Sequence, residues 1–446
     1  MHAVNLDGQY MFNLKFSKMM RDVQWSFISL ATAALSHLLL RIILGKELGP
    51  SGLGLYTLVF TIYMFGMQFA AFGIGIALTK YLAEHDDDLP RIKGFVSCGL
   101  FGSIVSGSMI GLLMYLLSET IAIQFFHSPE MVDLLKITAF CFPFIAIHKS
   151  IIGTLNGLRK MRWFAIVNIA QHVSVMIVSI IMVALLDMGV RGAVIGFVAP
   201  TIVVGILSLI VIREYFSAES ASMSTILKEV LWFGFYIVVA NSVGMINVQV
   251  DSLMVGHFMS ETDVGYYAVA IIFVEGLRLI PESVQRITTP AISNYYGKQE
   301  YGNIHGLMKN SILKVFAITM LISLTIILLG QFLIEMLFRE EFLPAYYPLL
   351  ILLIGYSVYA PVLSVSGALA GIGKVALMSK ISFACAVMNT ILNILLIPKY
   401  GITGAAIATS TSLIFTASLK WYFIKLYIPK PSGIIWNESP ERDVLR

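Results

Sequence analysis

Residues 153–160 read GTLNGLRK, and residues 367–374 read GALAGIGK, with four of eight positions identical at a separation of 214 residues. Chance resemblance between glycine-rich turns is the alternative explanation, but other segments match at nearly the same separation. The sequence therefore predicts two copies of one structural unit. The further matches, at separations of 212 and 211 residues, are GVRGAV (189–194) with GITGAA (401–406) and GLY (54–56) with GYY (265–267).

The composition indicates that both copies lie in a membrane. Apolar residues make up 58% of the 446 residues, charged residues make up 13%, and the mean hydropathy is +0.84. Soluble proteins carry about 25% charged residues, so this chain cannot cover a globule of its size with a charged surface. A soluble enzyme, a disordered chain, collagen and a coiled coil are thus excluded. The net charge of +4, dispersed along the chain, argues against a nucleic-acid partner.

Twelve apolar segments are long enough to cross a membrane as helices, which need about 20 residues each. We therefore predict an all-α polytopic membrane protein with twelve transmembrane helices. Because each copy holds an even number of spans, both have the same orientation. They form a parallel pseudo-two-fold repeat of two six-helix bundles, arranged as a V around a central cavity. The expected spans are 22–44, 54–82, 94–117, 131–154, 163–186, 192–213, 229–256, 264–290, 307–338, 346–370, 376–397 and 402–427.

The basic residues set the predicted orientation, because cytoplasmic loops are rich in Lys and Arg. The N-terminal segment and the loops after even-numbered spans are basic, whereas the opposite loops are poor in Lys and Arg. Both termini are thus expected on the cytoplasmic side of the cell membrane. The expected parts are an interfacial N-terminal segment (1–21), a first bundle (22–216), a cytoplasmic linker (217–228), a second bundle (229–428) and a cytoplasmic tail (429–446).

Motifs for catalysis are absent from the sequence. It contains no GxxxxGK(S/T) loop for ATP, no HExxH and no other metal-ligand spacing. Cys98, Cys141 and Cys385 are scattered through apolar stretches, which argues against a disulfide framework. We therefore expect a transporter that is not an enzyme and needs no cofactor, with H+ or Na+ as candidate coupling ions.

The eighth span holds the densest group of charges at membrane depth. Ionisable groups there cost about 2.5–3.5 kcal/mol each on insertion scales, so they normally face a cavity or a partner. Their spacings of three, four and seven residues place them on one helix face. They either line the cavity or form a self-neutralising ladder near the cytoplasmic end. The group comprises Glu275, Arg278, Glu282, Gln285 and Arg286.

Spans 1 and 7 carry a candidate outer gate. His37 and Arg41 lie one turn apart in span 1, and Asp251 lies on a polar stripe of span 7 with Asn247. At the repeat separation, Arg41 and Asp251 are near symmetry mates of opposite charge. They are expected to pair when the outer ends of these spans meet. The alternative is that each charge faces outer water.

Other polar residues are interpreted one at a time. In span 5, Gln171 and His172 are more typical of packing residues than of a proton relay. His148 and Lys149, like Lys80, fall near predicted cytoplasmic ends, where long basic side chains extend toward water.

Two segments near the N-terminus resemble a known family. LRIILGKELGPSGLGLY (40–56) and FGIGIALTKY (72–81) are similar to the opening segments of the polysaccharide flippase (Wzx-type) branch of the multidrug/oligosaccharidyl-lipid/polysaccharide (MOP) exporter superfamily. The turns at 153–160 and 401–406 also look like that family's repeats. The resemblance covers nearly the whole chain and implies a MATE-like fold. It implies a flippase that moves polyprenyl-diphosphate-linked oligosaccharide to the outer leaflet by alternating access, in polysaccharide biosynthesis.

A diphosphate head group requires basic residues, and Arg binds phosphate through paired hydrogen bonds. We predict that Arg278 binds the diphosphate, assisted by Arg286 and Lys80. Glu275 and Glu282 of span 8 hold the side chain of Arg278 in position. Expected partners are the lipid-linked oligosaccharide and membrane lipids, with a polysaccharide polymerase or glycosyltransferases as further candidates. The predicted substrate-binding residues are Arg278, Arg286, Lys80, Glu275, Glu282 and Asn247, and the predicted gate or coupling residues are Arg41, Asp251 and His37.

Several alternatives stay open. An ion-coupled multidrug exporter would need a cavity carboxylate, for which Asp251 and Glu275 qualify. The lipid-linked peptidoglycan precursor branch carries two extra C-terminal spans that are not expected here. A major-facilitator transporter would show GxxxDRxGRR in the loop that reads EHDDDLPRIKG (84–94). A scaffold or a membrane glycosyltransferase is disfavoured, because no large soluble loop is predicted.

Overall fold

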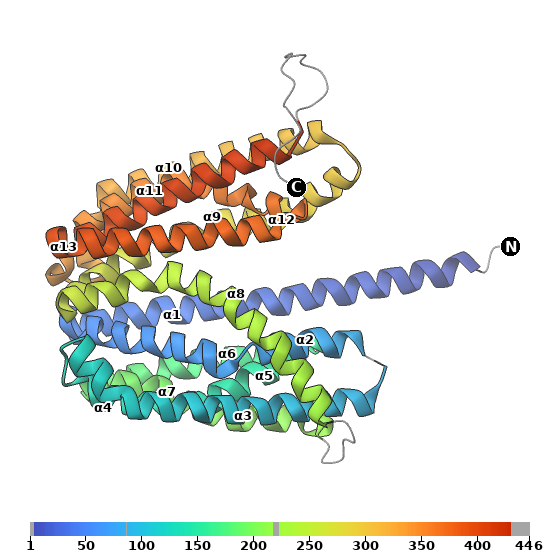
Figure 1. Ribbon diagram of the computed structural model, residues 1–446, viewed down its shortest axis with the longest axis horizontal. Helices are drawn as coiled ribbons and strands as arrows, with labels where there is room; N and C mark the ends of the chain where they lie inside the picture. Colours follow the sequence, from blue (N-terminus) through green and yellow to red (C-terminus); the bar gives the residue numbers. More distant parts are fainter. Residues whose placement is uncertain (1–3, 86, 217–222, 430–446) are drawn as a thin grey trace. The chain divides into compact units, whose positions relative to one another are not determined.

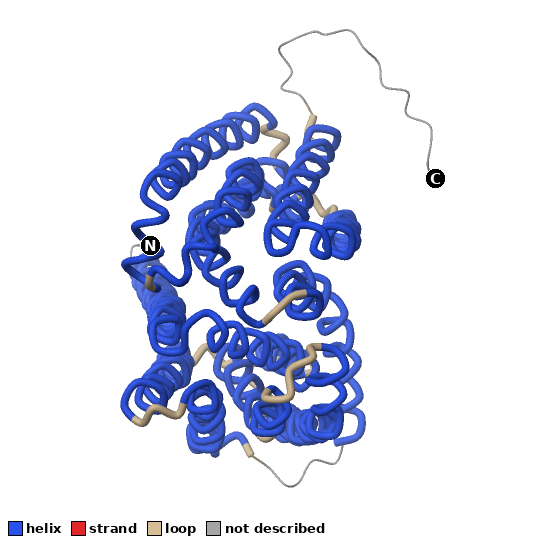
Figure 2. The backbone as a smooth tube through the Cα atoms, turned by 90° about the vertical axis from the view of Figure 1, so that its left-hand side faces the viewer, coloured by secondary structure: helices blue, strands red, loops and turns tan. Residues whose placement is uncertain are grey.

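The computed structural model describes residues 4–85, 87–216 and 223–429. Within these residues every regular element is a helix, and short loops connect the helices (Figure 2). The predicted all-α class is confirmed. In chain order the elements are α1 (Val4–Ala71), α2 (Ile74–Glu84), α3 (Leu89–Glu119), η1 (Thr120–Phe125), α4 (Met131–Ala139), α5 (Phe142–Gly157), α6 (Met161–Ile180), η2 (Ile181–Leu185), α7 (Gly189–Ser208), η3 (Leu209–Tyr215), α8 (Met223–Phe258), α9 (Glu261–Gly297), α10 (Tyr301–Phe338), η4 (Glu340–Ala345), α11 (Tyr346–Ser366), α12 (Ala368–Gly371) and α13 (Val375–Tyr427).

Nine helices of the described chain are long and apolar enough to cross a membrane, or ten if the bent pair α4 and α5 counts as one span. Helices are expected there because a bilayer offers backbone groups no water to bind. Two of these helices are interrupted, α1 by non-helical backbone at Gly49 and α13 by non-helical backbone at Gly401. Each joins two predicted spans across its break, and the total of twelve stays a prediction.

The turns between helices repeat along the chain. Residues with positive φ are uncommon outside glycine, because a Cβ clashes with the backbone there. Their recurrence at a nearly constant separation of 212–214 residues marks equivalent turns and supports the predicted repeat. The pairs are His127 (56°) with Arg339 (92°), Arg159 (53°) with Gly373 (81°), and Gly189 (57°) with Gly401 (60°).

The turns at 153–160 and 367–374, whose sequences match, also have the same hydrogen-bond pattern. After α5, the N–H groups of residues 158–160 donate to carbonyl oxygens of residues 154–156. After α12, the N–H groups of residues 372–374 donate to carbonyl oxygens of residues 368–370 in the same order. Both helices end at a glycine, and the second residue after that glycine has a positive φ, as is common where helices end. The two matching sequences therefore end their helices in the same way.

The chain forms two compact units. Unit 1 comprises Met1–Val269, Gln331–Tyr346 and Asn393–Ala405, and unit 2 comprises Ala270–Gly330, Tyr347–Leu392 and Ala406–Arg446. Unit 1 thus holds the first predicted bundle and the seventh predicted span (229–256). It also holds the connections after spans 7, 9 and 11, which were predicted on the outer face. The boundaries of the predicted bundles, their V-shaped arrangement and the central cavity stay predictions. Parts of the predicted N-terminal segment (1–3), linker (217–222) and tail (430–446) lie outside the described residues.

Close backbone contacts hold the helices of unit 1 together. In Figure 1, α1, α3, α5 and α6 run along one another, and α1 contacts α6 while α3 and α2 contact α5. Between α2 and α5, a Cβ added at Gly153 would overlap the backbone of Gly75. The Thr79 hydroxyl donates a 3.0 Å hydrogen bond to the Gly153 carbonyl across the same pair. Small residues of this kind are typical of helix interfaces in membranes, where backbones approach closely.

Candidate functional site

Four basic side chains from α1, α5 and α6 come together inside unit 1. The rings of His37 and His172 make an edge contact, with centroids 5.2 Å apart. The charges of His172, Arg41 and Lys149 all act on His37, and the charge of Lys149 acts on His172. We call these four residues the basic cluster.

The basic cluster is partly buried and still accessible. Lys149 is exposed, although its neighbours on α5, His148 and Ser150, are only 2% and 0% exposed. The other three cluster residues are half-buried. Partial removal from water strengthens each charge interaction. An anionic group that reaches the cluster would therefore be bound more strongly than on an open surface.

Polar groups beside the cluster are not all satisfied. The Gln171 amide donates a 2.8 Å hydrogen bond to the Thr201 hydroxyl. Within the described residues, the buried atoms His148 Nδ1 and Gln171 Oε1 have no hydrogen-bond partner. The charges of Lys149 and His172 reach His148, so its unsatisfied nitrogen lies close to the cluster. Buried polar atoms of this kind call for a water or a ligand, which favours a polar occupant.

Unit 1 also contains a buried carboxylate. Asp251 on α8 is 3% exposed and accepts a 2.6 Å hydrogen bond from the Asn393 amide and a 3.1 Å bond from the Tyr267 hydroxyl. These contacts connect α8 with α13 and α9. Both donors are neutral groups, and the pairing of Asp251 with Arg41 stays a prediction.

The second segment of α1 packs tightly against the start of α9, also within unit 1. A Cβ added at Gly54 would overlap the Glu261 carbonyl, and one added at Gly265 would overlap the Pro50 carbonyl. The Ser128 hydroxyl donates a hydrogen bond to the Glu261 carboxylate. Gly54 and Gly265 are the equivalent glycines of the GLY and GYY segments. We call the contact among Gly54, Ser128, Glu261 and Gly265 the outer closure, because the predicted orientation puts all four on the outer face.

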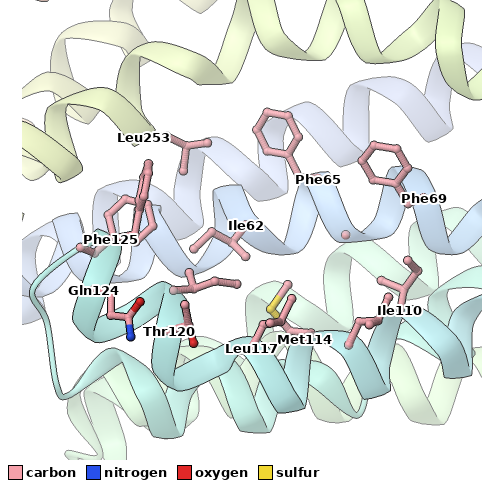
Figure 3. Close-up of a pocket in the computed structure, with 14 residues that line it drawn as sticks. Ile62, Phe65, Phe69, Ile110, Met114, Leu117, Thr120, Gln124, Phe125 and Leu253 are labelled. Carbon is pink, nitrogen blue, oxygen red and sulfur yellow. The ribbon is translucent and has the colours of Figure 1, made fainter. Parts of the chain in front are cut away.

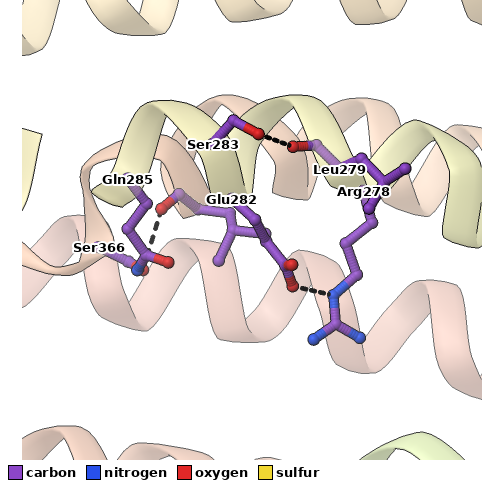
Figure 4. A network of polar contacts seen from close by, with 7 residues as sticks. Arg278, Leu279, Glu282, Ser283, Gln285 and Ser366 are labelled. Atoms are coloured by element: carbon purple, nitrogen blue, oxygen red, sulfur yellow. Dashed lines mark hydrogen bonds and ion pairs between the residues drawn. The ribbon is translucent and has the colours of Figure 1, made fainter. Parts of the chain in front are cut away.

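In unit 2, the charged stripe of α9 forms a local network (Figure 4). Arg278 Nε donates a 2.6 Å bond to Glu282, and the two side chains are 37% and 31% exposed. The two terminal nitrogens of Arg278 point away from Glu282 in Figure 4. Farther along, Gln285 donates a 2.8 Å bond to Ser366, which ends α11, and Glu275 is half-buried. The Arg278–Glu282 pair fits both the ladder and the cavity hypothesis, so both stay open.

Two tyrosines lie near Arg278 in unit 2, and a buried lysine contacts one of them. Tyr356 and Tyr359 on α11 are close enough to interact electrostatically with it. Lys420 on α13 is 6% exposed, and its ammonium lies 5.6 Å from the centre of the Tyr359 ring. A buried lysine is costly at membrane depth, and the cation–π contact offsets part of that cost. Sequence analysis did not single out these three residues.

The other predicted site residues make mostly local contacts. Lys80 lies 3.8 Å from Glu84 on the same helix and over the ring of Tyr81. Asn247 donates a 3.0 Å bond to a carbonyl one turn earlier on α8. Arg286 is exposed. Lys80 belongs to unit 1 and Arg286 to unit 2, so their predicted joint site is not tested.

An apolar pocket of about 780 Å³ lies in unit 1 among α1, α3, η1 and α8 (Figure 3). Its walls include Phe65, Leu117 and Leu253, and its polar side chains are Thr120 and Gln124. Such a lining suits a hydrocarbon chain. It offers no positive charge to a diphosphate, so it is separate in chemistry from the basic cluster.

The basic cluster as a unit was missed by sequence analysis. Lys149 and His148 were interpreted as side chains that extend toward water, His172 as a packing residue, and His37 with Arg41 as part of an outer gate. The available signal was weak, because Arg41 and Lys149 are 108 residues apart and nothing in the sequence places spans 1, 4 and 5 together.

Comparisons with known proteins agree with this architecture. The family model described as "Polysaccharide biosynthesis protein" matches residues 19–296, and the MatE family model matches residues 237–395. The chain is 23% identical over 396 residues to the putative O-antigen transporter of Shigella flexneri, which covers 86% of this chain and 92% of that protein. It is 26% identical over 194 residues to the probable low-salt glycan biosynthesis flippase Agl15 of Haloferax volcanii, covering 43% of this chain and 41% of that protein.

Solved structures show the same fold. The lipid II flippase MurJ in an inward closed conformation is similar with a TM-score of 0.75 and 20% identity, over 90% of this chain and 87% of that chain. An inward-facing MATE family multidrug resistance transporter of the MOP superfamily is similar with a TM-score of 0.72 and 15% identity, over 90% of this chain and 98% of that chain. The MATE-like fold of a multi-pass membrane protein is thus confirmed. Because the relatives are named as transporters and flippases, the prediction of a transporter that is not an enzyme is also confirmed.

Proposed function

Because the chain belongs to the polysaccharide biosynthesis protein family, we propose that it flips a polyprenyl-diphosphate-linked oligosaccharide across the cytoplasmic membrane. The basic cluster of unit 1 is the observation that carries the proposal. A diphosphate head group needs several basic donors in a partly desolvated place. A putative O-antigen transporter and a probable glycan biosynthesis flippase among the relatives support a glycan-bearing substrate.

The cluster residues divide the work of binding the head group. Arg41 presents a planar guanidinium that matches phosphate oxygens in pairs, and Lys149 supplies an accessible point charge. His37 and His172, in contact with each other, add ring N–H donors. The charges of Arg41 and Lys149 both act on His37, so an anion beside the cluster would be attracted.

Arg278 serves as a second anchor in unit 2. Glu282 holds its Nε, which leaves the terminal nitrogens in the orientation needed to bind phosphate. Within unit 2, Arg286 assists the anchor and Glu275 supports the arginine. In unit 1, Lys80 and Asn247 add further polar contacts to the substrate. These roles extend the sequence prediction and rest on the proposed substrate.

Transport proceeds by alternating access with both termini in the cytoplasm. The outer closure seals the outer side while the head group enters from the inner leaflet. Arg41 and Asp251 stabilise this closed state, and His37 participates in coupling to H+ or Na+. A polysaccharide polymerase or glycosyltransferases would receive or supply the glycan.

An ion-coupled multidrug exporter is the second candidate. The MatE match over residues 237–395 and the buried carboxylate of Asp251 favour it. An organic cation would, however, be repelled by the basic cluster. A flippase for a lipid-linked peptidoglycan precursor would share the diphosphate chemistry, so only the glycan separates it from the leading proposal.

Removal of the protein from its own cell tests the proposal. We expect a lipid-linked glycan to accumulate in the inner leaflet, and its chemical analysis would identify the substrate. Wild-type protein should relieve the accumulation, whereas the double variant Arg41→Gln/Lys149→Gln, at matched membrane levels, should not. If no glycan lipid accumulates and dye or drug efflux changes instead, the exporter is correct.

A further inference from the structure

A second basic pocket, of about 520 Å³, lies at one end of unit 1. Arg21, Asp22 and Trp25 of α1 line one wall, and the turn between α5 and α6 lines the other. That turn contributes residues 159–163, which read RKMRW. The pocket is assigned no part in the proposed transport.

The lining is strongly basic. It contains four cationic side chains and one carboxylate, and the carboxylate of Asp22 pairs with Arg159 at 3.1 Å. Lys160 binds Glu214 at 2.8 Å, outside the pocket lining. No ion pair among the described residues involves Arg21 or Arg162. The pocket therefore has an excess of positive charge, to which these two arginines contribute most.

Backbone donors add to the positive charge. The first three residues of α6 line the pocket, and their N–H groups have no partner within a helix of this kind. The N-cap residue, Lys160, makes no capping side-chain bond to them. The N-terminal end of the 20-residue helix α6 therefore presents donors and a positive dipole beside the arginines.

The pocket lies at the predicted level of the membrane surface. Trp25 falls near the start of the first predicted span (22–44), and Trp163 is the first residue of the fifth (163–186). Trp is enriched where hydrocarbon meets head groups, and Trp163 is 47% exposed. A ligand here would have its charge at the surface and its chains in the bilayer.

We propose that this pocket binds the phosphate head group of an anionic phospholipid of the surrounding membrane. The two arginines and the start of α6 hold the phosphate, and the two tryptophans contact the upper part of the acyl chains. Burial alone would lower the pKa of Lys160, but Glu214 and Tyr215 raise the pKa above its usual value, so this residue stays cationic beside the pocket. Basic pockets between helices on the cytoplasmic side are suited to anionic lipids, and the predicted orientation puts this end on that side.

Native mass spectrometry of the purified full-length protein tests the proposal, with phosphatidylglycerol and phosphatidylcholine as probes. We expect wild-type protein to prefer phosphatidylglycerol. The variant Arg21→Gln/Arg162→Gln should lose roughly 30-fold in affinity for that lipid, from the usual contribution of two basic residues at a charged surface. Lys298→Gln, an exposed basic residue on the same predicted face in unit 2, is the matched control and should bind as wild type.

The outcomes separate the proposal from its rivals. An unchanged lipid preference in the double variant, or an equal loss in the Lys298→Gln control, would overturn it. Displacement by millimolar inorganic phosphate as effective as by the lipid would mean a phosphate-ion site. Tighter binding of a polyprenyl diphosphate, lost in the double variant, would mean a substrate entry site. Unfolding temperature and elution profile show whether the double variant is folded, and the charge-preserving Arg21→Lys/Arg162→Lys should retain most of the preference.

Discussion

The proposed function of this chain depends on a few basic residues at membrane depth. Placing a charge at membrane depth is costly, so several charges together need a compensating role. For the basic cluster we propose a bound anion as this compensation, because Arg41 and Lys149, whose charges act on His37, are both cationic. His148 Nδ1, which is buried near the cluster and has no hydrogen-bond partner among the described residues, also favours a polar ligand there.

Neutralising the cluster should reduce transport without unfolding the protein. Each of Arg41→Gln and Lys149→Gln removes one charge-assisted contact, worth about 1.5–3 kcal/mol. We therefore expect the apparent affinity for a lipid-linked diphosphate to fall roughly 10- to 100-fold in each variant. A flipping assay in proteoliposomes measures the effect. Arg91→Gln, an exposed residue outside the cluster, serves as control. Wild-type affinity in both cluster variants would exclude the cluster as the head-group site.

Arg278 should not tolerate lysine. Its Nε donates a hydrogen bond to Glu282, while its two terminal nitrogens point away from Glu282. A lysine has one ammonium group and cannot make contacts in both directions with the same geometry. Arg278→Lys should therefore lose most transport while the protein stays folded, and Arg278→Ala should be more damaging than Arg286→Ala. A flipping or complementation assay, with the variants at equal levels in the membrane, shows which of the two alanine variants loses more transport. Normal transport by Arg278→Ala would identify the stripe as a structural ladder.

Among the elements, equivalent glycines permit the tightest contacts. Gly54 and Gly265 let α1 and α9 meet backbone to backbone, and Gly75 and Gly153 do the same for α2 and α5. Glycine is needed at these four positions for space, since an added Cβ would overlap a neighbouring carbonyl. At Gly49 and Gly401 it is needed for backbone freedom instead, because φ is positive there.

Adding one methyl group at the outer closure should weaken it. Gly54→Ala would force α1 away from the Glu261 carbonyl, at a cost of about 1–3 kcal/mol, the usual range for overpacking. We expect a lower unfolding temperature in detergent and reduced flipping. Gly244→Ala is the matched control, because nothing lies within 4 Å of the added Cβ and alanine favours a helix. Equal behaviour of the two variants would contradict the closure.

At the scale of the whole molecule, the proposed alternating access would require the outer closure, a contact within unit 1, to open. Ser128 and Glu261 are hydrogen-bonded across it, so the two thiols of the variant Ser128→Cys/Glu261→Cys should be within reach of a short bifunctional methanethiosulfonate cross-linker, which spans more distance than a direct disulfide. The three native cysteines are buried and should not interfere. We expect the cross-linked double variant to stop flipping and a reductant to restore it, while single-cysteine variants keep flipping after either treatment. Normal transport by a fully cross-linked protein would rule out opening at this contact.

Much of the architecture was predictable because its signals are local. Apolar runs of membrane length, basic loops and the GTLNGLRK/GALAGIGK turns each depend on a few neighbouring residues, and the helical class and superfamily are confirmed. The breaks at Gly49 and Gly401 are so tight that α1 and α13 each continue through two predicted spans. For that reason the count of twelve stays a prediction, as does the boundary between the bundles.

The sequence by itself determined that this protein is an all-helical membrane transporter with an internal repeat. Hydrophobicity and turn chemistry act over short stretches of chain, so they can be read without knowing the neighbours. Only the tertiary structure decided which polar residues meet. It brought His37, Lys149 and His172 together from helices distant in the sequence, and it joined Asp251 to Asn393 across 142 residues. Hydrogen bonds need direct contact and charge interactions weaken with distance, so such sites depend on packing that no single segment encodes.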